Sequence, residues 1–486
     1  MIRLIFISFL SLFLLLSCSD SNSKDVKAKN TELNKNRKFK DIIESGKIKA
    51  ITTYSGTTYF LYRGQPMGFE YEILKKFAED LNLELEIVIA KDENKLIDML
   101  KANKGDIIAY GYTITEERKK EIDFSIPLYL SHQVLVQRKP NNWRKMKLHN
   151  IREQLISNPV ELIGDTVSVK RNSSYAQRIV NLSEEVGGKI YIDTIPGQMT
   201  TDEIFKNIAE GKIKYSIVDQ NVASIYASDY PILDISTKMS FSQRIAWGLR
   251  KDSNQLKDTL NQWLKRAKKT VDYHVIYNKY FKNRRSFRKR VKSEFYSLND
   301  QKISPYDDLI KKYAKKLGWD WRLIASIVYQ ESQFKPSNES WTGATGLMQI
   351  MPRTAEELKI TNPTDPEQSL RGGTKYLSQL WKAHITVPDS IQRIKFTLAS
   401  YNAGLFHIKD AQRLASHLKL DSLQWDKNVE NALLKLDKPE FYNKDFIKYG
   451  YVRAKEPYKY VKEIFERYEH YKAFIDRNPN LKEEEL

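Results

Sequence analysis

Residues 46–281 alternate between strand-like and helix-like segments, and few folds accommodate such an order. Short apolar runs are separated by longer segments whose apolar residues recur at helical spacing. The expected strands are 47–53, 84–90, 106–112, 131–138, 166–170, 189–193, 214–218 and 244–250, and the expected helices are 69–81, 94–102, 174–181, 201–210, 253–268 and 271–281. This alternation predicts an α/β domain. The run 131–138 would cross to a second lobe and 244–250 would return, so we expect two lobes.

Three motifs in this domain are more specific than the alternation itself. They read Gly68-Phe69-Glu70-Tyr71-Glu72, Tyr112-Thr113-Ile114-Thr115-Glu116-Glu117-Arg118 and Asp123-Phe124-Ser125. With these motifs, residues 46–281 resemble the periplasmic amino-acid-binding proteins, the family-3 solute-binding domain. The resemblance implies a two-lobed, periplasmic-binding-protein-like fold that binds an amino acid or a muropeptide, a peptide fragment of the cell wall.

The same resemblance assigns ligand contacts to five positions in the N-terminal domain. Thr113 and Arg118 match the pair that holds the ligand α-carboxylate, which a guanidinium can grip with two parallel bonds. Ser173 and Ser174 match a backbone-donor site at the start of a helix, where anions are favoured. Asp219 matches the acid that binds the ligand ammonium.

Some of these positions also have simpler interpretations. Arg118 lies in a Glu-Glu-Arg-Lys-Lys run and could be a solvated surface side chain, while Asp219 could be a helix N-cap. Asn172 stands where the family usually has glycine before the two serines. Because asparagine tolerates left-handed backbone geometry, we expect the turn to be retained.

Residues 320–352 contain the second informative pattern. Asp320 is an expected helix N-cap, and the apolar residues after it recur at helical spacing (Leu323, Ile324, Ile327 and Val328). Glu331 falls at the far end of this helix, beside a loop rich in Gly, Ser and Thr. Burial there would remove hydration from the carboxyl and raise its pKa, which is the state that a general acid needs near neutral pH.

Four sequence blocks extend this pattern in a fixed order. They are Glu331-Ser332, Gly346-Leu347-Met348-Gln349, Ala399-Ser400-Tyr401-Asn402 and Tyr460-Val461. Together they make residues 305–486 resemble the lytic transglycosylases with the goose-lysozyme-like fold. The resemblance implies a mainly α, lysozyme-like domain, and helical periodicity is indeed expected at 307–317, 369–382, 391–401, 405–414, 428–436 and 457–474.

The resemblance also implies a reaction on peptidoglycan. Glu331 would protonate the β-1,4 glycosidic oxygen between N-acetylmuramic acid and N-acetylglucosamine, and the sugar's own C6 hydroxyl would close a 1,6-anhydro ring without water. The implied glycan contacts are Ser340, Met348, Gln349, Tyr401, Asn402 and Tyr460. Tyr460 would orient Glu331, although Tyr458 is a second candidate for that role. Such a reaction requires no metal ion and no cofactor.

Two other functions are compatible with the same residues. A hydrolytic glycosidase normally uses two carboxylates, and the candidates for a second one are Glu339, Asp365 and Glu367. The chain could therefore be a hydrolytic muramidase on the same fold. It could also be a solute-sensing lipoprotein whose C-terminal domain binds the wall without cleaving it.

The N-terminal residues resemble a bacterial lipoprotein signal. Residues 1–17 combine Arg3 with an apolar run typical of a signal peptide, and Leu15-Leu16-Ser17-Cys18 resembles a lipobox. Cys18 is the only cysteine in 486 residues, so we expect it to carry the lipid anchor. The polar segment 18–45 is expected to be a flexible tether. Ser19 favours the periplasmic face of the outer membrane by the sorting rule of lipoproteins.

The net charge of +19 requires nucleic acid to be considered as a partner. Within the expected linker 282–304, seven basic residues and no acidic one fall at 282–292. The sequence has no zinc-ligand set, phosphate loop or RNA-binding signature, so no specific nucleic-acid partner is expected. The basic run is interpreted either as an exposed linker or helix face, or as a docking segment for anionic membrane or wall polymer.

Overall fold

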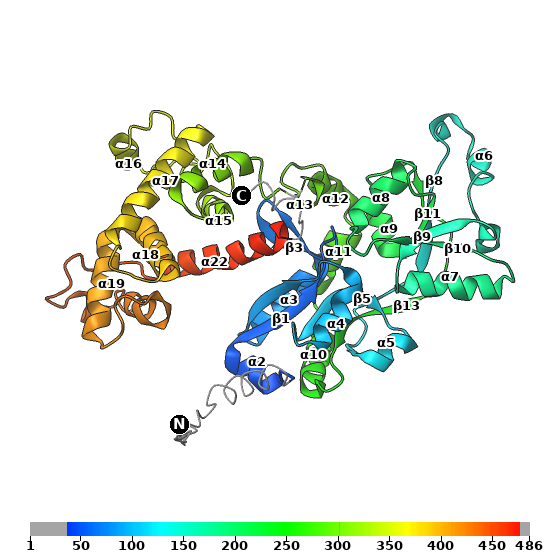
Figure 1. Ribbon diagram of the computed structural model, residues 1–486, viewed down its shortest axis with the longest axis horizontal. Coiled ribbons are helices and arrows are strands. Elements are labelled where there is room, and N and C mark those ends of the chain that lie inside the picture. Colours follow the sequence, from blue (N-terminus) through cyan, green and yellow to red (C-terminus); the bar gives the residue numbers. More distant parts are fainter. Residues whose placement is uncertain (1–35, 301, 477–486) are drawn as a thin grey trace, which may run out of the picture.

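The computed structural model describes residues 36–300 and 302–476, which form a two-lobed α/β domain followed by a helical domain (Figure 1). The predicted signal peptide, Cys18 and the first part of the predicted tether lie outside the described residues. None of the helices within the described ranges combines the length and the apolar composition needed to cross a bilayer.

Lobe 1 is built on a mixed sheet whose strands follow the order β4-β1-β5-β13-β6, with β7 also paired to β13. The strands are β1 (Lys47–Thr52), β4 (Glu84–Ile89), β5 (Ile107–Thr113), β6 (Asp123–Phe124), β7 (Tyr129–Ser131) and β13 (Gln243–Leu249). The helices around it are α3 (Phe69–Asp80), α4 (Leu96–Lys101), α5 (Glu116–Glu121), α10 (Asn254–Ala267) and α11 (Val271–Phe281). Strands β5 and β13 are mostly buried on both faces, so helices must cover both sides of the sheet.

Lobe 2 is formed by the chain between β7 and β13. Its strands are β8 (Gln133–Arg138), β9 (Thr166–Lys170), β10 (Tyr191–Ile195), β11 (Tyr215–Asp219) and β12 (Leu233–Asp234). Its helices are α6 (Leu148–Arg152), α7 (Ser174–Glu185), α8 (Thr201–Ala209) and α9 (Gln220–Tyr226). The chain enters this lobe through β8 and returns to the lobe 1 sheet through β13, which confirms the predicted two-lobed fold.

The two lobes are in direct contact across the cleft between them. Asp202 of lobe 2 is the central residue of one such contact, because it accepts hydrogen bonds from the backbone N–H of Gly56 in lobe 1 (3.1 Å) and from the hydroxyls of Tyr226 and Tyr296 (both 2.7 Å). Tyr296 belongs to the segment that leads to the helical domain. This half-buried carboxylate therefore connects both lobes and the segment that joins the domains.

The prediction that the tether extends to residue 45 is wrong at its C-terminal end. Helix α2 (Phe39–Ser45) occupies that part, and Ile42 is buried in the core of lobe 1. Arg37 pairs with the carboxylate of Asp106 at 2.6 Å. The segment is ordered because one apolar side chain and one ion pair attach it to the sheet. The polar composition of the segment does not reveal these two contacts.

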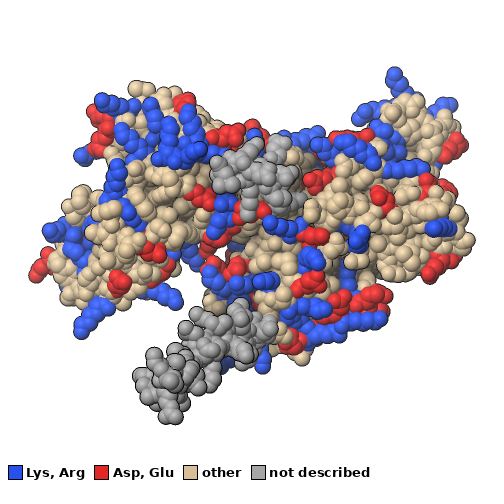
Figure 2. All heavy atoms as spheres, viewed as in Figure 1, with Lys and Arg blue, Asp and Glu red and all other residues tan. Residues whose placement is uncertain are grey.

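The segment 282–304, predicted as a basic linker, contains two described helices, and six of the seven basic side chains at 282–292 are exposed, as expected for the helix-face interpretation. Residues Arg284–Val291 form helix α12, and Ser297–Asp300 form α13. Phe287 and Arg290 of α12 are buried, and the Arg290 guanidinium lies 5.4 Å from the ring centroid of Tyr280. The apolar residues among the basic ones therefore pack onto lobe 1 and lobe 2. Figure 2 shows Lys and Arg spread over the visible face of both domains and interspersed with Asp and Glu.

The helical domain consists of nine described α-helices between residues 302 and 476. They are α14 (Asp307–Leu317), α15 (Trp321–Ser332), α16 (Pro352–Glu357), α17 (Pro366–Ala383), α18 (Ser390–Ala403), α19 (Leu405–His417), α20 (Glu430–Leu433), α21 (Pro439–Tyr442) and α22 (Lys455–Ile475). The apolar face predicted for α15 is buried, and α15 lies against α22, where the Ser326 hydroxyl donates to the carbonyl of Ile464 at 2.8 Å.

A short hairpin of lobe 1, which the sequence analysis missed, joins the two domains. Strands β2 (Phe60–Tyr62) and β3 (Gln65–Met67) project from lobe 1 toward the end of α22. The Gly64 carbonyl at the tip of the hairpin accepts a hydrogen bond from the Tyr471 hydroxyl at 3.0 Å. At its base the Tyr59 hydroxyl lies 2.6 Å from Nδ1 of His470. The two domains therefore share one continuous apolar core at this contact.

Candidate active site

Glu331 is the next-to-last residue of α15, where the chain turns sharply into a loop. The two residues after Ser332 have left-handed φ values of 53° and 58°, which end the helix. The Ser332 hydroxyl donates to the carbonyls of Val328 (3.1 Å) and Leu347 (2.9 Å). The Glu-Ser pair is therefore held between the helix and the far side of the loop.

The carboxyl of Glu331 is desolvated and accepts a hydrogen bond from one donor among the described residues. The Tyr460 hydroxyl donates to its Oε1. Burial raises the pKa of Glu331 to about 7, and the hydrogen bond from Tyr460 opposes that rise. Within the described residues, no second carboxyl contributes to this pKa. Glu331 can therefore carry a proton near neutral pH and also release it.

Tyr401 and Tyr460 approach Glu331 from two other helices, α18 and α22. The Tyr401 hydroxyl donates to the backbone carbonyl of Met348 at 2.7 Å. Burial, followed by the proximity of Glu331, raises the pKa of both tyrosines well above 10. Both hydroxyls therefore stay protonated and act as hydrogen-bond donors in this site. The contact of Tyr460 with Glu331 is the one that the sequence resemblance implied, and its catalytic role stays a prediction.

The prediction that the Met348 side chain lines sugar subsites is wrong. Met348 is fully buried, and a Cβ added at Gly373 of α17 would lie 2.6 Å from its side chain. Its backbone N–H donates to the Ser369 hydroxyl at 3.1 Å, while its carbonyl accepts from Tyr401. Met348 therefore fixes the wall of the site from behind. The Gly372-Gly373 pair within α17 is the feature of the sequence that could have indicated this packing.

The loop 333–351 contains two further predicted glycan contacts. The side-chain nitrogen of Gln349 donates to the carbonyls of Asn338 (2.9 Å) and Gly346 (3.1 Å). Ser340 is half-buried, and its hydroxyl accepts the N–H of Ala344 at 2.9 Å. Both side chains thus hold the shape of the loop, and their glycan contacts stay predictions.

Asn402 and Gly346 belong to two of the four sequence blocks around Glu331. Asn402 is exposed at the end of α18, directly after Tyr401. Gly346 has φ 87°, and a Cβ there would overlap the carbonyl of Pro363. Only glycine fits such a close backbone approach. Steric exclusion of a Cβ therefore explains why the Gly-Leu-Met-Gln block begins with glycine.

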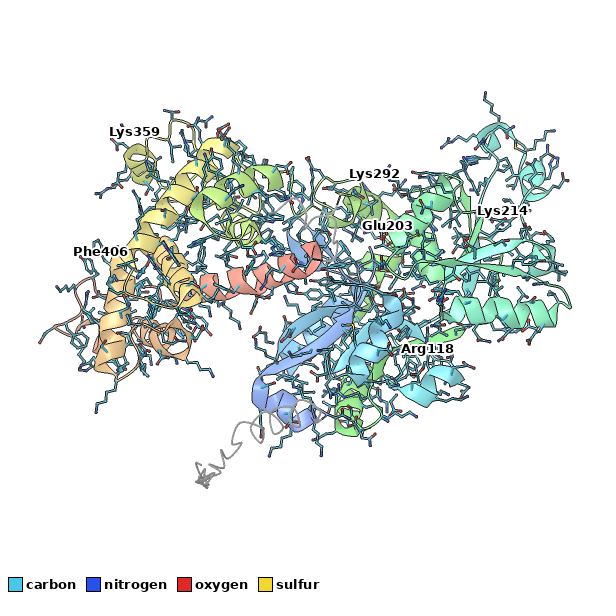
Figure 3. The ribbon with its side chains drawn as sticks, in the orientation of Figure 1. Arg118, Glu203, Lys214, Lys292, Lys359 and Phe406 are labelled. Atoms are coloured by element: carbon cyan, nitrogen blue, oxygen red, sulfur yellow. The ribbon has the colours of Figure 1, made fainter. Side chains whose placement is uncertain are left out.

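The five predicted ligand residues of the N-terminal domain gather around the cleft between the lobes. Nη1 of Arg118 donates to the carbonyl of Thr113 at 3.0 Å, and its guanidinium lies 4.1 Å from the ring centroid of Tyr112. The Ser174 hydroxyl donates to Oγ1 of Thr113 across the cleft at 3.3 Å. Arg118, which Figure 3 marks near α5, lines a cavity of about 530 Å³ together with Ser173 and Ser174.

Ser173 and Asp219 both occupy N-cap positions but differ in what they bind. Ser173 caps α7 by accepting the N–H of Ala176 at 3.1 Å. Asp219 makes no capping hydrogen bond with its side chain, is buried, and lines a second, inner cavity of the cleft. Asn172 has φ 56°, which confirms that asparagine adopts the left-handed turn expected before the two serines.

Comparison with known proteins assigns both parts of the chain. The model for bacterial extracellular solute-binding proteins, family 3, matches residues 47–283, and the transglycosylase SLT domain matches 308–423. A membrane-bound lytic murein transglycosylase F from Desulfosudis oleivorans is 31% identical over 88% of this chain and 90% of its own length. The chain belongs to the membrane-bound lytic murein transglycosylase F family.

A second relative agrees with the membrane-bound lytic murein transglycosylase F assignment. The protein of that name from Aliivibrio fischeri is 30% identical over 92% of this chain and 88% of its own length. Among solved structures, the ancestral amino acid-binding protein AncCDT-1, a precursor of cyclohexadienyl dehydratase, is 26% identical over 50% of this chain and 98% of that chain, with a TM-score of 0.42.

Each of the two matched ranges contains residues of one candidate site, the cleft between the lobes or the site around Glu331. The solute-binding match contains all five cleft residues, and the SLT match contains Glu331, Tyr401 and Asn402. Tyr460 lies beyond the SLT match, on the last described helix. The donor to Glu331 is therefore supplied by a segment that folds back from outside the matched range.

Proposed function

We propose that this chain is a peptidoglycan lytic transglycosylase that cleaves the β-1,4 bond between N-acetylmuramic acid and N-acetylglucosamine. The observation that carries the proposal is a single desolvated carboxyl, Glu331, at a helix end with a tyrosine hydroxyl donating to it. Membership of the transglycosylase F family and the SLT match support the same activity.

The proposed mechanism uses Glu331 twice. Protonated Glu331 first gives its proton to the glycosidic oxygen, so that the bond to C1 of N-acetylmuramic acid breaks and the N-acetylglucosamine product leaves with a free hydroxyl. The ionised carboxylate then accepts the proton of the C6 hydroxyl while that oxygen bonds to C1, which closes the 1,6-anhydro ring. Glu331 ends protonated, as it began, and water is not consumed.

The surroundings of the other acids favour this mechanism over hydrolysis. Glu339 is exposed on the loop, Asp365 caps α17 by accepting the N–H of Gln368 at 2.8 Å, and Glu367 pairs with Lys312 at 2.5 Å. A hydrolytic muramidase would need one of them as base or nucleophile. Mass spectrometry of digested peptidoglycan separates the two reactions: we expect 1,6-anhydro ends, and free reducing ends would instead establish a muramidase.

Replacing Tyr460 with phenylalanine should shift the pH dependence of the reaction. The first step needs protonated Glu331, so activity should fall as the pH rises through its pKa of about 7. The Tyr460 hydroxyl stabilises the ionised carboxylate and thereby lowers this pKa. In Tyr460→Phe the descending limb of the pH–rate profile should therefore move to higher pH, and the maximal rate should fall about tenfold.

The matched control for this change is Tyr458→Phe. Tyr458 lies on the same helix but lines a different pocket, with Trp425 and Phe465. Its pH–rate profile should coincide with that of the unmodified protein. If Tyr458→Phe shifted the descending limb of the pH–rate profile and Tyr460→Phe did not, Tyr458 would be the residue that orients Glu331.

The N-terminal domain is proposed to bind an amino acid or a muropeptide and to regulate cleavage. The support is the path between the sites: Thr57 and Thr58, at the base of the hairpin, line the inner cavity of the cleft, and Gly64 at its tip contacts Tyr471. A Cβ at Gly64 would also lie 2.6 Å from Tyr329, two residues before Glu331. A ligand that changes the closure of the lobes would thus displace the hairpin against the catalytic helix.

The membrane attachment is proposed to be a lipid on Cys18, at the periplasmic face of the outer membrane. The support is the Leu15-Leu16-Ser17-Cys18 motif, followed by Ser19, in a chain with one cysteine. Cells labelled with radioactive palmitate should incorporate label into the unmodified protein and not into Cys18→Ser, whereas the single replacement Ser23→Ala should leave labelling intact. Equal labelling of the unmodified protein and Cys18→Ser would contradict a lipid anchor on Cys18.

A further inference from the structure

The inner cavity of the cleft contains two carboxyl groups that form no ion pair with any basic side chain of the described residues. It is lined by both lobes, with Glu70 of α3 on one side and Asp219 of β11 on the other. Glu70 is 2% exposed and Asp219 is 5% exposed. The cavity volume is about 60 Å³. Because one water molecule needs roughly 10–15 Å³ of such volume, the cavity holds about four to six water molecules.

Each of these carboxyls presents an oxygen without a partner. Among the described residues, neither Oε2 of Glu70 nor Oδ1 of Asp219 has a hydrogen-bond donor. Gly111 of β5 makes the space for Glu70, because a Cβ there would lie 3.3 Å from its Oε1 and 3.0 Å from the Tyr129 hydroxyl. Burial raises the pKa of Glu70 to about 8 and that of Asp219 to about 7. Leaving such groups unpaired in a protein interior is costly.

The other charged groups of the cavity do not satisfy them. Glu93 is also present, but it pairs with Lys170 across the lobes at 2.5 Å. The cavity therefore holds three acidic side chains and one lysine, with Glu70 and Asp219 left over. Arg118 lines the neighbouring cavity and acts on Asp219 only as a nearby charge.

We propose that the N-terminal domain selects a free amino acid with a cationic side chain, such as lysine or arginine. This inference rests on the ligand binding proposed above and adds Glu70 as the residue that determines specificity. Asp219 would bind the α-ammonium, Arg118 the α-carboxylate, and Glu70 the ammonium or guanidinium of the side chain. The rings of Tyr110, Tyr129 and Tyr175, which line the same cavity, would pack against the stem and the cation.

The test is calorimetric titration of the purified full chain with matched pairs of ligands. L-Lysine is compared with L-norleucine, and L-arginine with L-citrulline, because each pair differs mainly in the side-chain charge. We expect the cationic member to bind about 30-fold more tightly. Nα-Acetyl-L-lysine represents a lysine carried by a peptide and should bind at least about tenfold more weakly than L-lysine, because it lacks the α-ammonium for Asp219.

Two variants separate the failure of this inference from the failure of ligand binding in general. In Glu70→Gln the preference for the cationic member should fall to about threefold or less, while the affinity for L-norleucine is retained. Glu79→Gln, an exposed position on the same helix, should behave like the unmodified protein. Equal binding within each pair by the unmodified protein would overturn the selectivity even if Glu70→Gln failed to fold. Binding of none of the four paired ligands would overturn this inference and would leave a muropeptide as the ligand of the N-terminal domain.

Discussion

Replacing Glu331 with glutamine should reduce the release of 1,6-anhydromuropeptides from peptidoglycan by about a thousandfold. Glutamine keeps the size and most of the packing of the side chain but carries no transferable acidic proton. The proposed mechanism uses this group both as acid and as base, so both steps fail together. The rate is measured by chromatography and mass spectrometry of the soluble products at pH 6, where Glu331 is mostly protonated given its pKa of about 7.

The matched control is Glu339→Gln, which removes an exposed acid of the loop that follows α15. Because Glu339 is solvated and has no assigned role in the proposed mechanism, its variant should retain activity within about twofold. A rate in Glu331→Gln close to that of the unmodified protein would contradict catalysis by this residue. It would favour the alternative in which the domain binds the wall without cleaving it.

Replacing Gly64 with valine should destabilise the contact between the two domains by about 3 kcal/mol. Gly64 has φ 73°, and a Cβ there would lie 2.6 Å from Tyr329 and 2.9 Å from Phe334, with the Tyr471 hydroxyl closer still. A β-branched side chain would therefore push the hairpin out of its place behind the catalytic helix. Urea unfolding followed by tryptophan fluorescence should change from one joint transition to two, and transglycosylase activity should fall with the loss of the contact.

Gly46→Val is the control that separates backbone strain from the steric clash. Gly46 has a similar φ of 66°, but nothing lies within 4 Å of a Cβ built there. This variant should lose about 1 kcal/mol from the strained backbone alone and keep the joint transition. If both variants behaved alike, the effect at Gly64 would come from backbone strain, and the hairpin would not connect the domains energetically.

The sequence alone predicted the elements whose patterns are local. Helices such as α15 and α22, and strands such as β9, follow from the spacing of apolar side chains, which a residue shares with neighbours three or four positions away. The motifs around Arg118 and Glu331 likewise located both candidate sites, because they are short runs of specific residues. The crossing of the chain between the lobes was predicted from the local strand-like runs 131–138 and 244–250.

Only the tertiary structure decided which distant residues meet. It paired Tyr460, rather than Tyr458, with Glu331, and it placed the side chain of Met348 behind the site against Gly373. It also packed α12 and the β2–β3 hairpin into the space between the domains, and it placed Glu70 and Asp219 in the lining of one cavity. These contacts depend on how helices and sheets pack in three dimensions, and the periodicity of a segment carries no information about the partner that will cover it.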